Sequence, residues 1–189
     1  LIAVTRLAQT VAEMSEGEVT QLLNSGNTGM TRSIYFDVVD KKSASLMAWC
    51  VAAGAWAVDD IRKADALARF GRHVGTAFQI TDDVLDYTGD RNATGKKPGR
   101  DLAQGKLTLP LLMAIEKRPG LVDSISRDMT EETIEAVFQE VCASGAPEEA
   151  LELAREHVAE GIAALANVDE SPSKEALIRL AHHLVERVV

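Results

Sequence analysis

Residues 78–87 read Phe-Gln-Ile-Thr-Asp-Asp-Val-Leu-Asp-Tyr, residues 94–102 read Thr-Gly-Lys-Lys-Pro-Gly-Arg-Asp-Leu, and residues 105–110 read Gly-Lys-Leu-Thr-Leu-Pro. The first segment places three carboxylates in one apolar helical turn. Asp82 and Asp86 share a helix face and Asp83 lies about 100° round from Asp82, so we expect all three to reach one centre. A helix stop at Gly89 would set them at the negative end of the helix dipole, where they need a positive partner.

That positive partner is expected to be a hard divalent cation. Carboxylate oxygens without histidine or cysteine nearby suit magnesium rather than zinc. Magnesium keeps several waters and shares its other positions between one or two carboxylates and substrate phosphates. We therefore interpret Asp82, Asp83 and Asp86 as candidate Mg²⁺ ligands.

Two lysines, Lys96 and Lys106, follow in a segment that glycine and proline interrupt. A flexible backbone there can bring their ammonium groups opposite phosphates bound to the metal. The simpler alternative is a solvated helix end followed by an ordinary surface loop, because short acidic motifs often occur by chance. Taken alone, the acidic triplet and its lysines leave both interpretations open.

The composition favours an all-helical domain. Apolar residues make up 46% of the 189 residues and aromatic residues only 4%, and alanine, leucine and valine are abundant. A chain of this length can bury one substantial core, and the regular alternation of helix and loop patterns shows no domain boundary. We expect a single domain over residues 1–189, built as an antiparallel helical bundle with a reactive cavity among its helices.

Local signals place the starts of most helices. Residues 1–25 follow a helical apolar period, and Ser33 is a suitable N-cap for the next helix. Asp59-Asp60 supplies charge at the start of the long helix that ends at the acidic cluster, and Lys63 replaces the acid that a second metal motif would need. Later helices are expected after Thr130, at Pro147 and after Ser171.

The charge and the rare residue types exclude several classes of protein. A net charge of −9 argues against a nucleic-acid surface. Cys50 and Cys142 are interpreted as small core residues in a reducing compartment, so a cytoplasmic location is expected. No run of about 18 uncharged apolar residues occurs, so no transmembrane helix is expected. The four histidines, at positions 73, 157, 182 and 183, show no companions that complete a ligand set and are interpreted as surface or satisfied core residues.

The motifs closely resemble the second Asp-rich region of the trans-isoprenyl diphosphate synthases, also called the polyprenyl synthetase family. The matching elements are Phe78-Gln79-Ile80 before the acids, Gly95-Lys96, Asp101-Leu102 and the segment 105–110. The resemblance extends from the opening residues almost to the C-terminus. It implies an all-helical fold and a Mg²⁺-dependent homodimer that transfers an allylic prenyl diphosphate onto isopentenyl diphosphate and releases pyrophosphate.

The same resemblance implies roles for residues before the acids. The segment 35–44 is similar to a family segment whose lysine and hydroxyl contact the allylic diphosphate, here Lys42 and Ser43, with serine in place of the more usual threonine. Gln79 and Ser43 would orient polar groups, and Phe78 belongs to the same substrate-binding set. Lys42, Lys96 and Lys106 would neutralise the departing pyrophosphate.

Two further pairs of residues have more than one interpretation. Glu18 and Gln21 resemble a family feature that faces the active-site helices, but as plain chemistry they could equally be surface residues. Gly71 and Gly75 lie four apart inside the long helix, where each costs roughly 1 kcal/mol relative to alanine. Close helix packing is the first explanation for these glycines, and a ligand passing near the backbone is the second.

One departure from the family pattern is large. The family uses two Asp-rich regions on facing helices, and the first of them, with the arginines that follow it, is absent here. Asp-Asp-x-x-Asp occurs once, no Arg-Arg pair occurs, and the chain has neither an initiator methionine nor a signal-peptide pattern. We therefore expect a chain that is incomplete at the N-terminus and inactive or feeble alone.

Two other functions remain open. A non-catalytic helical subunit could partner an active synthase, although a site that no longer catalyses a reaction would be free to lose its acids and lysines. A terpene cyclase or other lyase would share magnesium and the helical cavity, yet it would not need Gly95-Lys96 and the segment 105–110 in this form.

Overall fold

The computed structural model describes residues 1–88, 99–126 and 129–187, and every regular element within these ranges is a helix. The expected all-α class is thereby confirmed. The elements in chain order are α1 (Ile2–Leu23), α2 (Arg32–Val39), the π-helical turn η1 (Asp40–Ala44), α3 (Ser45–Ala57), α4 (Ile61–Thr88), α6 (Arg100–Ala103), α7 (Leu109–Lys117), the 3₁₀ helix η2 (Pro119–Ser124), α8 (Glu131–Ala143), α9 (Ala146–Ala164) and α10 (Pro172–Glu186).

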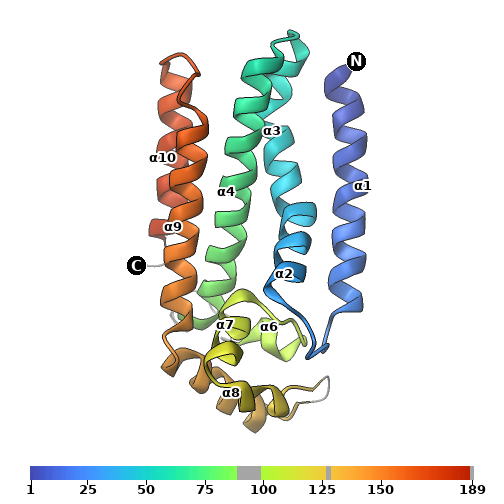
Figure 1. The fold of residues 1–189 in the computed structure, drawn as a ribbon, viewed down its shortest axis with the longest axis vertical. Helices are drawn as coiled ribbons and strands as arrows, with labels where there is room; N and C mark the ends of the chain where they lie inside the picture. Colours follow the sequence, from blue (N-terminus) through green and yellow to red (C-terminus); the bar gives the residue numbers. More distant parts are fainter. Residues whose placement is uncertain (89–98, 127–128, 188–189) are drawn as a thin grey trace.

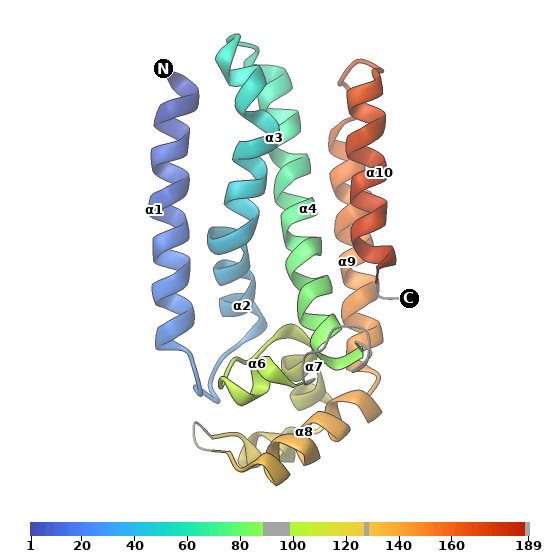
Figure 2. The same cartoon turned by 180° about the vertical axis from the view of Figure 1, so that it is seen from behind.

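The long helices run along the longest dimension of the molecule, and the short ones gather across one end (Figures 1 and 2). α4 contacts α3 and α9 along its length, and α9 also contacts α10. α1 lies at the edge of the bundle, where it contacts α2, η1 and α3. The C-terminal end of α4, which carries the acidic cluster, therefore lies at the end of the bundle where the short helices gather.

α4 forms the centre of the hydrophobic core. Phe70, Val74, Ile80 and Val84 recur at helical spacing and are each at most 5% exposed. Burial of side chains of this size stabilises the fold by about 1.5–3 kcal/mol each. The helix that holds the acids is consequently fixed by packing along most of its length.

The two interior glycines of α4 let neighbouring backbones approach closely. A Cβ atom added at Gly71 would lie 2.6 Å from the Cα of Ala48, and one added at Gly75 would lie 2.6 Å from the Cα of Ala44. Such distances are shorter than any normal carbon contact. The first explanation offered for these glycines, close helix packing, is confirmed.

α2, η1 and α3 follow one another without a break, and η1 interrupts the α-helical hydrogen bonding with one wider turn. Isolated π-helical turns occur frequently at functional sites. The N-cap predicted at Ser33 is wrong by two residues, because Thr31 is the N-cap and its hydroxyl accepts a hydrogen bond from the Ile34 N–H at 3.3 Å. Both residues are suitable caps, so the sequence did not discriminate between them.

The other predicted helix starts agree with the structure. The Asp60 carboxylate accepts a hydrogen bond from the Lys63 N–H at 3.1 Å, as an N-cap does at the start of α4. Thr130 and Ser171 cap α8 and α10 in the same way. Pro147 lies in the first turn of α9 after Gly145, whose positive φ of 71° separates α9 from α8.

α1 presents several apolar side chains to solvent. Val4 is 68% exposed, Val11 53% and Leu22 63%, whereas the buried positions of this helix are Thr10 and Gly17. A contiguous exposed apolar surface on a helix is typical of a contact surface for another polypeptide segment.

The interpretation of both cysteines as core residues is wrong for Cys50, which is exposed, while Cys142 is partly buried. The nearly uniform hydrophobicity of α3 gave no sign of which positions are exposed. None of the helices formed by the described residues combines the length and hydrophobicity that crossing a bilayer requires.

Candidate active site

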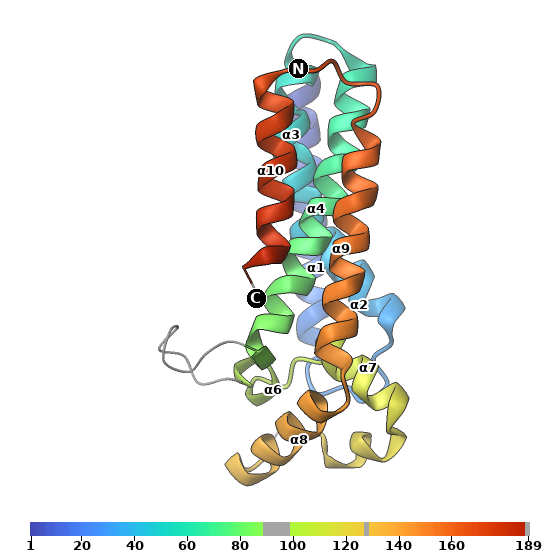
Figure 3. The same ribbon diagram turned by 90° about the vertical axis from the view of Figure 1, so that its left-hand side faces the viewer.

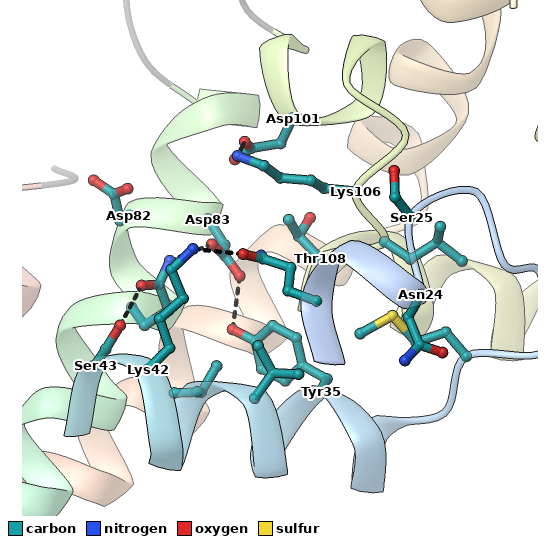
Figure 4. Close-up of a pocket in the computed structure, with 16 residues that line it drawn as sticks. Asn24, Ser25, Tyr35, Lys42, Ser43, Asp82, Asp83, Asp101, Lys106 and Thr108 are labelled. Carbon is teal, nitrogen blue, oxygen red and sulfur yellow. Dashed lines mark hydrogen bonds and ion pairs between the residues drawn. The ribbon is translucent and has the colours of Figure 1, made fainter. Parts of the chain in front are cut away.

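A pocket of about 110 Å³ lies at the end of the bundle that the short helices cover. Its walls come from the end of α1, from α2 and η1, from α4, and from the segment between α6 and α7 (Figure 4). Six residues that the sequence identified as candidates line it: Lys42, Ser43, Gln79, Asp82, Asp83 and Lys106. Residues far apart in the chain are thus brought to one cavity.

Asp83 lies at the base of a buried hydrogen-bond network. The Tyr35 hydroxyl donates to Asp83 Oδ2 at 2.7 Å, and the Gln79 amide donates to Asp83 Oδ1 at 2.9 Å. The Ser43 hydroxyl in turn donates to the Gln79 side-chain oxygen at 3.0 Å. This network connects α2, η1 and α4, and it fixes which atoms Gln79 and Ser43 present to the pocket.

Burial raises the pKa of Asp83 to about 7, because the 3% exposed carboxyl has lost most of its contact with water. The two donated hydrogen bonds act in the opposite direction, and the nearby acids Asp101 and Asp82 raise the pKa further. Asp83 is therefore an acid that changes its charge near neutral pH.

Asp82 is the carboxylate that remains available to a ligand. Its side chain is exposed at the pocket, and it has no hydrogen bond or ion pair to another described residue. A carboxylate in this state is a suitable direct ligand for a hard cation that also takes water and phosphate oxygens.

The Asp86 carboxylate is hydrogen-bonded to the backbone at the start of α6. Its two carboxylate oxygens accept hydrogen bonds from the Arg100 N–H at 3.1 Å and from the Asp101 N–H at 3.0 Å. Partial burial raises the pKa of Asp86, although these two N–H groups act to lower it. Asp86 thus positions α6 against α4 and so helps to place Asp101 and Lys106.

The three aspartates do not form a compact set of ligands in this structure. Within the described ranges, only one group of three candidate side chains has its ligand atoms all within 4.8 Å of one another, and that group is His73, His157 and Glu160. Magnesium is usually shared between one or two carboxylates and substrate phosphates, so a ready-made set of three is not required. The donors present fit an ion held by Asp82 together with a phosphorylated substrate.

Lys42 extends from η1 across the pocket towards α1. Its ammonium group lies 2.5 Å from Glu18 Oε2 and donates to the Gln21 side-chain oxygen at 2.6 Å. Gly17 makes this approach possible, because a Cβ atom there would lie 2.9 Å from the Lys42 backbone nitrogen. Glu18 and Gln21, for which the sequence left two interpretations, therefore both contact Lys42.

Lys106 reaches the pocket from the opposite side. Its ammonium group lies 2.8 Å from Asp101 Oδ1, and the two residues are joined by the turn that contains Gly105 at a φ of 69°. The Gly105 carbonyl accepts a hydrogen bond from the Gly26 N–H at 2.8 Å, which holds this turn against the end of α1. Lys42 and Lys106 thus flank the cavity from η1 and from the segment after α6 (Figure 4).

Three predicted site residues are not placed in the pocket. Asp86, whose carboxylate accepts hydrogen bonds from the backbone of α6, is not among the residues that line it. Lys96 lies outside the described residues. Phe78 is not among the residues that line the pocket, and the guanidinium group of Arg187 lies 4.8 Å from the centre of its ring. Phe78 and Asp82 are four residues apart on α4, yet only Asp82 lines the pocket.

Sequence reasoning did not assign roles to Tyr35, Asp101 or Asn24, which also line the pocket. Tyr35 and Asp101 stand inside segments that resemble the family motifs, and that was the available signal. Asn24 follows the last residue of α1, and its side chain donates to the Thr20 carbonyl at 2.9 Å. Its position depends on the turn between α1 and α2, which no motif specifies.

Comparison with known proteins gives a consistent result. The chain matches the family model described as Polyprenyl synthetase over residues 2–141. It is 36% identical over 190 residues to a prenyl transferase of Cyanophora paradoxa, which covers 100% of this chain and 59% of that protein. It is also 36% identical over 187 residues to the octaprenyl diphosphate synthase of Escherichia coli K12, covering 96% of this chain and 58% of that protein.

The fold is likewise shared with solved structures. The polyprenyl synthase of Caulobacter crescentus CB15, crystallised with calcium and isoprenyl diphosphate, superposes with a TM-score of 0.91 at 34% identity, over 100% of this chain and 60% of that one. The chain spans less than two thirds of the length of these relatives. Since the family model covers most of the chain, the chain belongs to the polyprenyl synthetase family.

Proposed function

We propose that this chain supplies part of the active site of a Mg²⁺-dependent trans-polyprenyl diphosphate synthase, which transfers an allylic prenyl diphosphate onto isopentenyl diphosphate. The observation that carries the proposal is the exposed carboxylate of Asp82, which has no partner among the described residues, at a pocket flanked by Lys42 and Lys106. A carboxylate and two ammonium groups around one cavity suit a metal-bound diphosphate.

The names of the relatives support this substrate class. The Escherichia coli relative is an octaprenyl diphosphate synthase. The Caulobacter relative was crystallised with a divalent cation and an isoprenyl diphosphate. A homodimeric assembly and a cytoplasmic location stay predictions from the sequence.

In this proposal each side chain has a defined task. Mg²⁺, when bound, supplies positive charge that stabilises the departing pyrophosphate. Asp82 holds the metal directly, and Asp83 and Asp86 join it only where their present hydrogen bonds rearrange. Lys42 and Lys106 exchange their carboxylate partners for phosphate oxygens, since both ion pairs are partly exposed and weak.

The remaining candidates orient the substrate. Ser43 and Gln79 form one hydrogen-bonded pair at the pocket wall, and Gln79 is itself fixed by Asp83. The Ser43 hydroxyl and the Gln79 amide can therefore present defined donors to diphosphate oxygens. We include Lys96 as a third cation for the pyrophosphate because of its place in the family-like segment.

We also propose that the chain alone has little or no activity. This chain covers 59%, 58% and 60% of these relatives, so roughly two fifths of each relative lies outside the match. The sequence also contains a single Asp-Asp-x-x-Asp motif. The exposed apolar face of α1 supports this view, because such a surface is expected to contact a further polypeptide segment.

The proposal is tested by calorimetry and by product analysis. Titration of pyrophosphate into the purified protein should release or absorb heat with Mg²⁺ present, and little with a chelator. Absence of Mg²⁺-assisted binding of pyrophosphate or of a non-hydrolysable prenyl diphosphate would contradict the proposed site. Steady incorporation of labelled isopentenyl diphosphate by the 189-residue chain would contradict the proposed need for a further segment.

A heteromeric enzyme is the second candidate, and one relative favours it. The chain is 30% identical over 185 residues to heptaprenyl diphosphate synthase component 2 of Bacillus subtilis, whose name makes it one of at least two components. Reconstitution distinguishes a heteromeric enzyme from a homomeric one, because a heteromeric enzyme gains turnover only when a different polypeptide is added. Product analysis without isopentenyl diphosphate separates both from a lyase, which would still consume the allylic substrate.

A further inference from the structure

A second group of ligand-type side chains lies between α4 and α9, outside the pocket described above. His73 Nδ1 lies 3.2 Å from His157 Nδ1 and 3.2 Å from Glu160 Oε2, and all three ligand atoms lie within 4.8 Å of one another. Within the described ranges, this is the only group of three such side chains that converges so closely. The interpretation of the four histidines as lacking companions is therefore wrong for His73 and His157.

Two helices bring these residues together. His157 and Glu160 are three residues apart on α9 and share one helix face. α4 and α9 pack side by side (Figure 3). Gly161 allows the close approach, because a Cβ atom there would lie 3.1 Å from the Cβ of His73 and 3.4 Å from the Phe70 carbonyl. His73 and His157 are 84 positions apart in the sequence, so no local pattern predicts that they meet.

Protons alone do not satisfy this arrangement well. A neutral imidazole carries one N–H, and His73 Nδ1 faces two possible acceptors at the same distance. One proton on Nδ1 can be donated along only one of these directions. A cation placed between the three atoms accepts a lone pair from each of them, so it satisfies all three at once.

The ligand types indicate which cation would bind. Imidazole nitrogens suit zinc and neighbouring transition metals rather than magnesium, and two histidines with one carboxylate form a known type of open zinc site. Tetrahedral zinc with bonds of 2.0–2.1 Å places its ligand atoms roughly 3.3 Å apart, close to the spacing of the nitrogens here. His73 and Glu160 keep exposed side-chain fractions of 32% and 63%, so water can complete the coordination.

We propose that His73, His157 and Glu160 bind one divalent transition-metal ion, zinc by preference, which ties α4 to α9. The site is separate from the magnesium site of the proposed function, since His73 precedes Asp82 by nine residues, roughly 13 Å along α4. His157 and Glu160 also lie beyond the residues that match the family model. The bound ion stabilises the folded state, because the unfolded chain does not hold the three ligands together.

Metal titration tests the site directly. All proteins carry Cys50→Ser, because an exposed thiol also binds zinc. Titration of zinc chloride in an excess of Mg²⁺ should give one zinc per chain, and the melting temperature should rise. His73→Gln and His157→Gln should each abolish this stoichiometric uptake, and Glu160→Gln should weaken it by about tenfold or more.

Two matched variants serve as controls. His182→Gln changes an exposed histidine of α10 and should leave zinc uptake unchanged. Asp82→Ala should also leave it unchanged, so the zinc test stays independent of the magnesium site. Circular dichroism of the zinc-free variants establishes that they fold, and Glu160→Gln covers the case in which a histidine variant does not, since Glu160 is largely exposed.

Cobalt provides a readout of the geometry. Co²⁺ bound by two imidazoles and a carboxylate in a four-coordinate site should show strong visible absorption without a thiolate charge-transfer band, and His73→Gln should remove it. Zinc uptake that persists in His73→Gln and His157→Gln would overturn the proposal. So would the absence of zinc binding by the parent protein, which would leave an ordinary hydrogen-bonded histidine pair.

Discussion

At the scale of single residues, Asp83 is placed where a negative charge is unfavourable. Its carboxyl group is buried, it lies near Asp82 and Asp101, and it is held by hydrogen bonds from Tyr35 and Gln79. Because the folded state raises the pKa of Asp83 above its ordinary value, the folded protein binds this proton more tightly than the unfolded chain does. The resulting stability is fully present below the ordinary carboxyl pKa and is lost as the pH rises through about 7.

The first prediction follows from this loss of stability with rising pH. In a chelator, the free energy of unfolding of the parent protein should fall relative to that of Asp83→Asn by up to about 3 kcal/mol between about pH 5 and pH 8.5. Urea denaturation at the two pH values measures this difference. Asp65→Asn, an exposed aspartate of the same helix, should follow the parent protein. A pH-independent difference between Asp83→Asn and the parent would contradict the assignment.

The second prediction concerns Asp82 in the active enzyme. Asp82→Ala should lower magnesium-dependent incorporation of labelled isopentenyl diphosphate by at least about a hundredfold, because it removes the pocket carboxylate that has no partner among residues 1–88, 99–126 and 129–187. The side chain is exposed, so the melting temperature should hardly change. Asp65→Ala is the matched control and should retain the parent rate. A normal rate in Asp82→Ala would show that the metal is held elsewhere.

At the scale of single residues, the sequence identified which residues belong to the candidate site but not which other residues they contact. Lys42, Ser43, Gln79 and the three acids stood out because their types and spacing resemble a known motif. The pocket contains all of them except Asp86. The hydrogen bond from Tyr35 to Asp83 was not predictable, because it depends on how two helices 48 residues apart in the chain lie against each other. Periodicity describes one helix and carries no information about its partner.

At the scale of helices, α4 is positioned by small residues as well as by large ones. Gly71 and Gly75 bring its backbone against Ala48 and Ala44, and Gly161 brings α9 against the same helix. Helices that approach so closely have little freedom to shift along each other. Asp82, Asp83 and Asp86 therefore lie on a helix whose neighbours on both sides are in close contact.

The third prediction compares two glycines in neighbouring helices. Gly71→Ala should destabilise the protein by about 1–3 kcal/mol, because the new Cβ atom would overlap the Ala48 backbone. Gly54→Ala in α3 should be neutral or stabilise by up to about 1 kcal/mol, since nothing lies within 4 Å of its added Cβ atom. Urea denaturation midpoints report both changes. Equal effects of the two substitutions would contradict the packing argument.

Helix boundaries were predictable where a side chain defines them locally. Thr130, Ser171 and Asp60 each accept a hydrogen bond from a backbone N–H close by, so three or four residues of sequence contain the signal. The π-helical turn η1 was not predictable from such signals. It lies where Gly17 of α1 meets the Lys42 backbone, which is a contact between distant parts of the chain.

At the scale of the whole molecule, the stability of the helices should be uneven. α4 contacts helices on several sides, whereas α1 contacts α2, η1 and α3 on one side and exposes Val4 and Leu22 on the other. Few buried contacts allow a helix to open locally at a small free-energy cost. α1 thus buries fewer of its side chains against the described chain than α4 does.

The fourth prediction is made for this difference. In native-state hydrogen exchange of the 189-residue chain, the amides of α1 should exchange by local opening well before those of α4. The amides of α9 should be protected to a similar degree as those of α4. Leu22→Ser should leave the midpoint of global unfolding within about 0.5 kcal/mol of the parent, because the side chain is already 63% exposed. Equal protection of α1 and α4 would show that the apolar face of α1 is covered, for instance by a second copy of the chain.

The π-helical turn also fixes the rotational phase between the two helices it joins. A π turn contains one more residue than the α-helical turn it replaces, and one residue corresponds to about 100° of rotation. Deleting one residue within 40–44 would let a regular α-helix run through this place while Tyr35 still faces the acids and Ala48 still faces Gly71. Keeping that residue and restoring α-helical hydrogen bonding would instead rotate one helix by about 100° relative to the other. In comparisons with homologues, a single-residue gap at this place would therefore mark the loss of the π turn, with the contacts on either side of it retained.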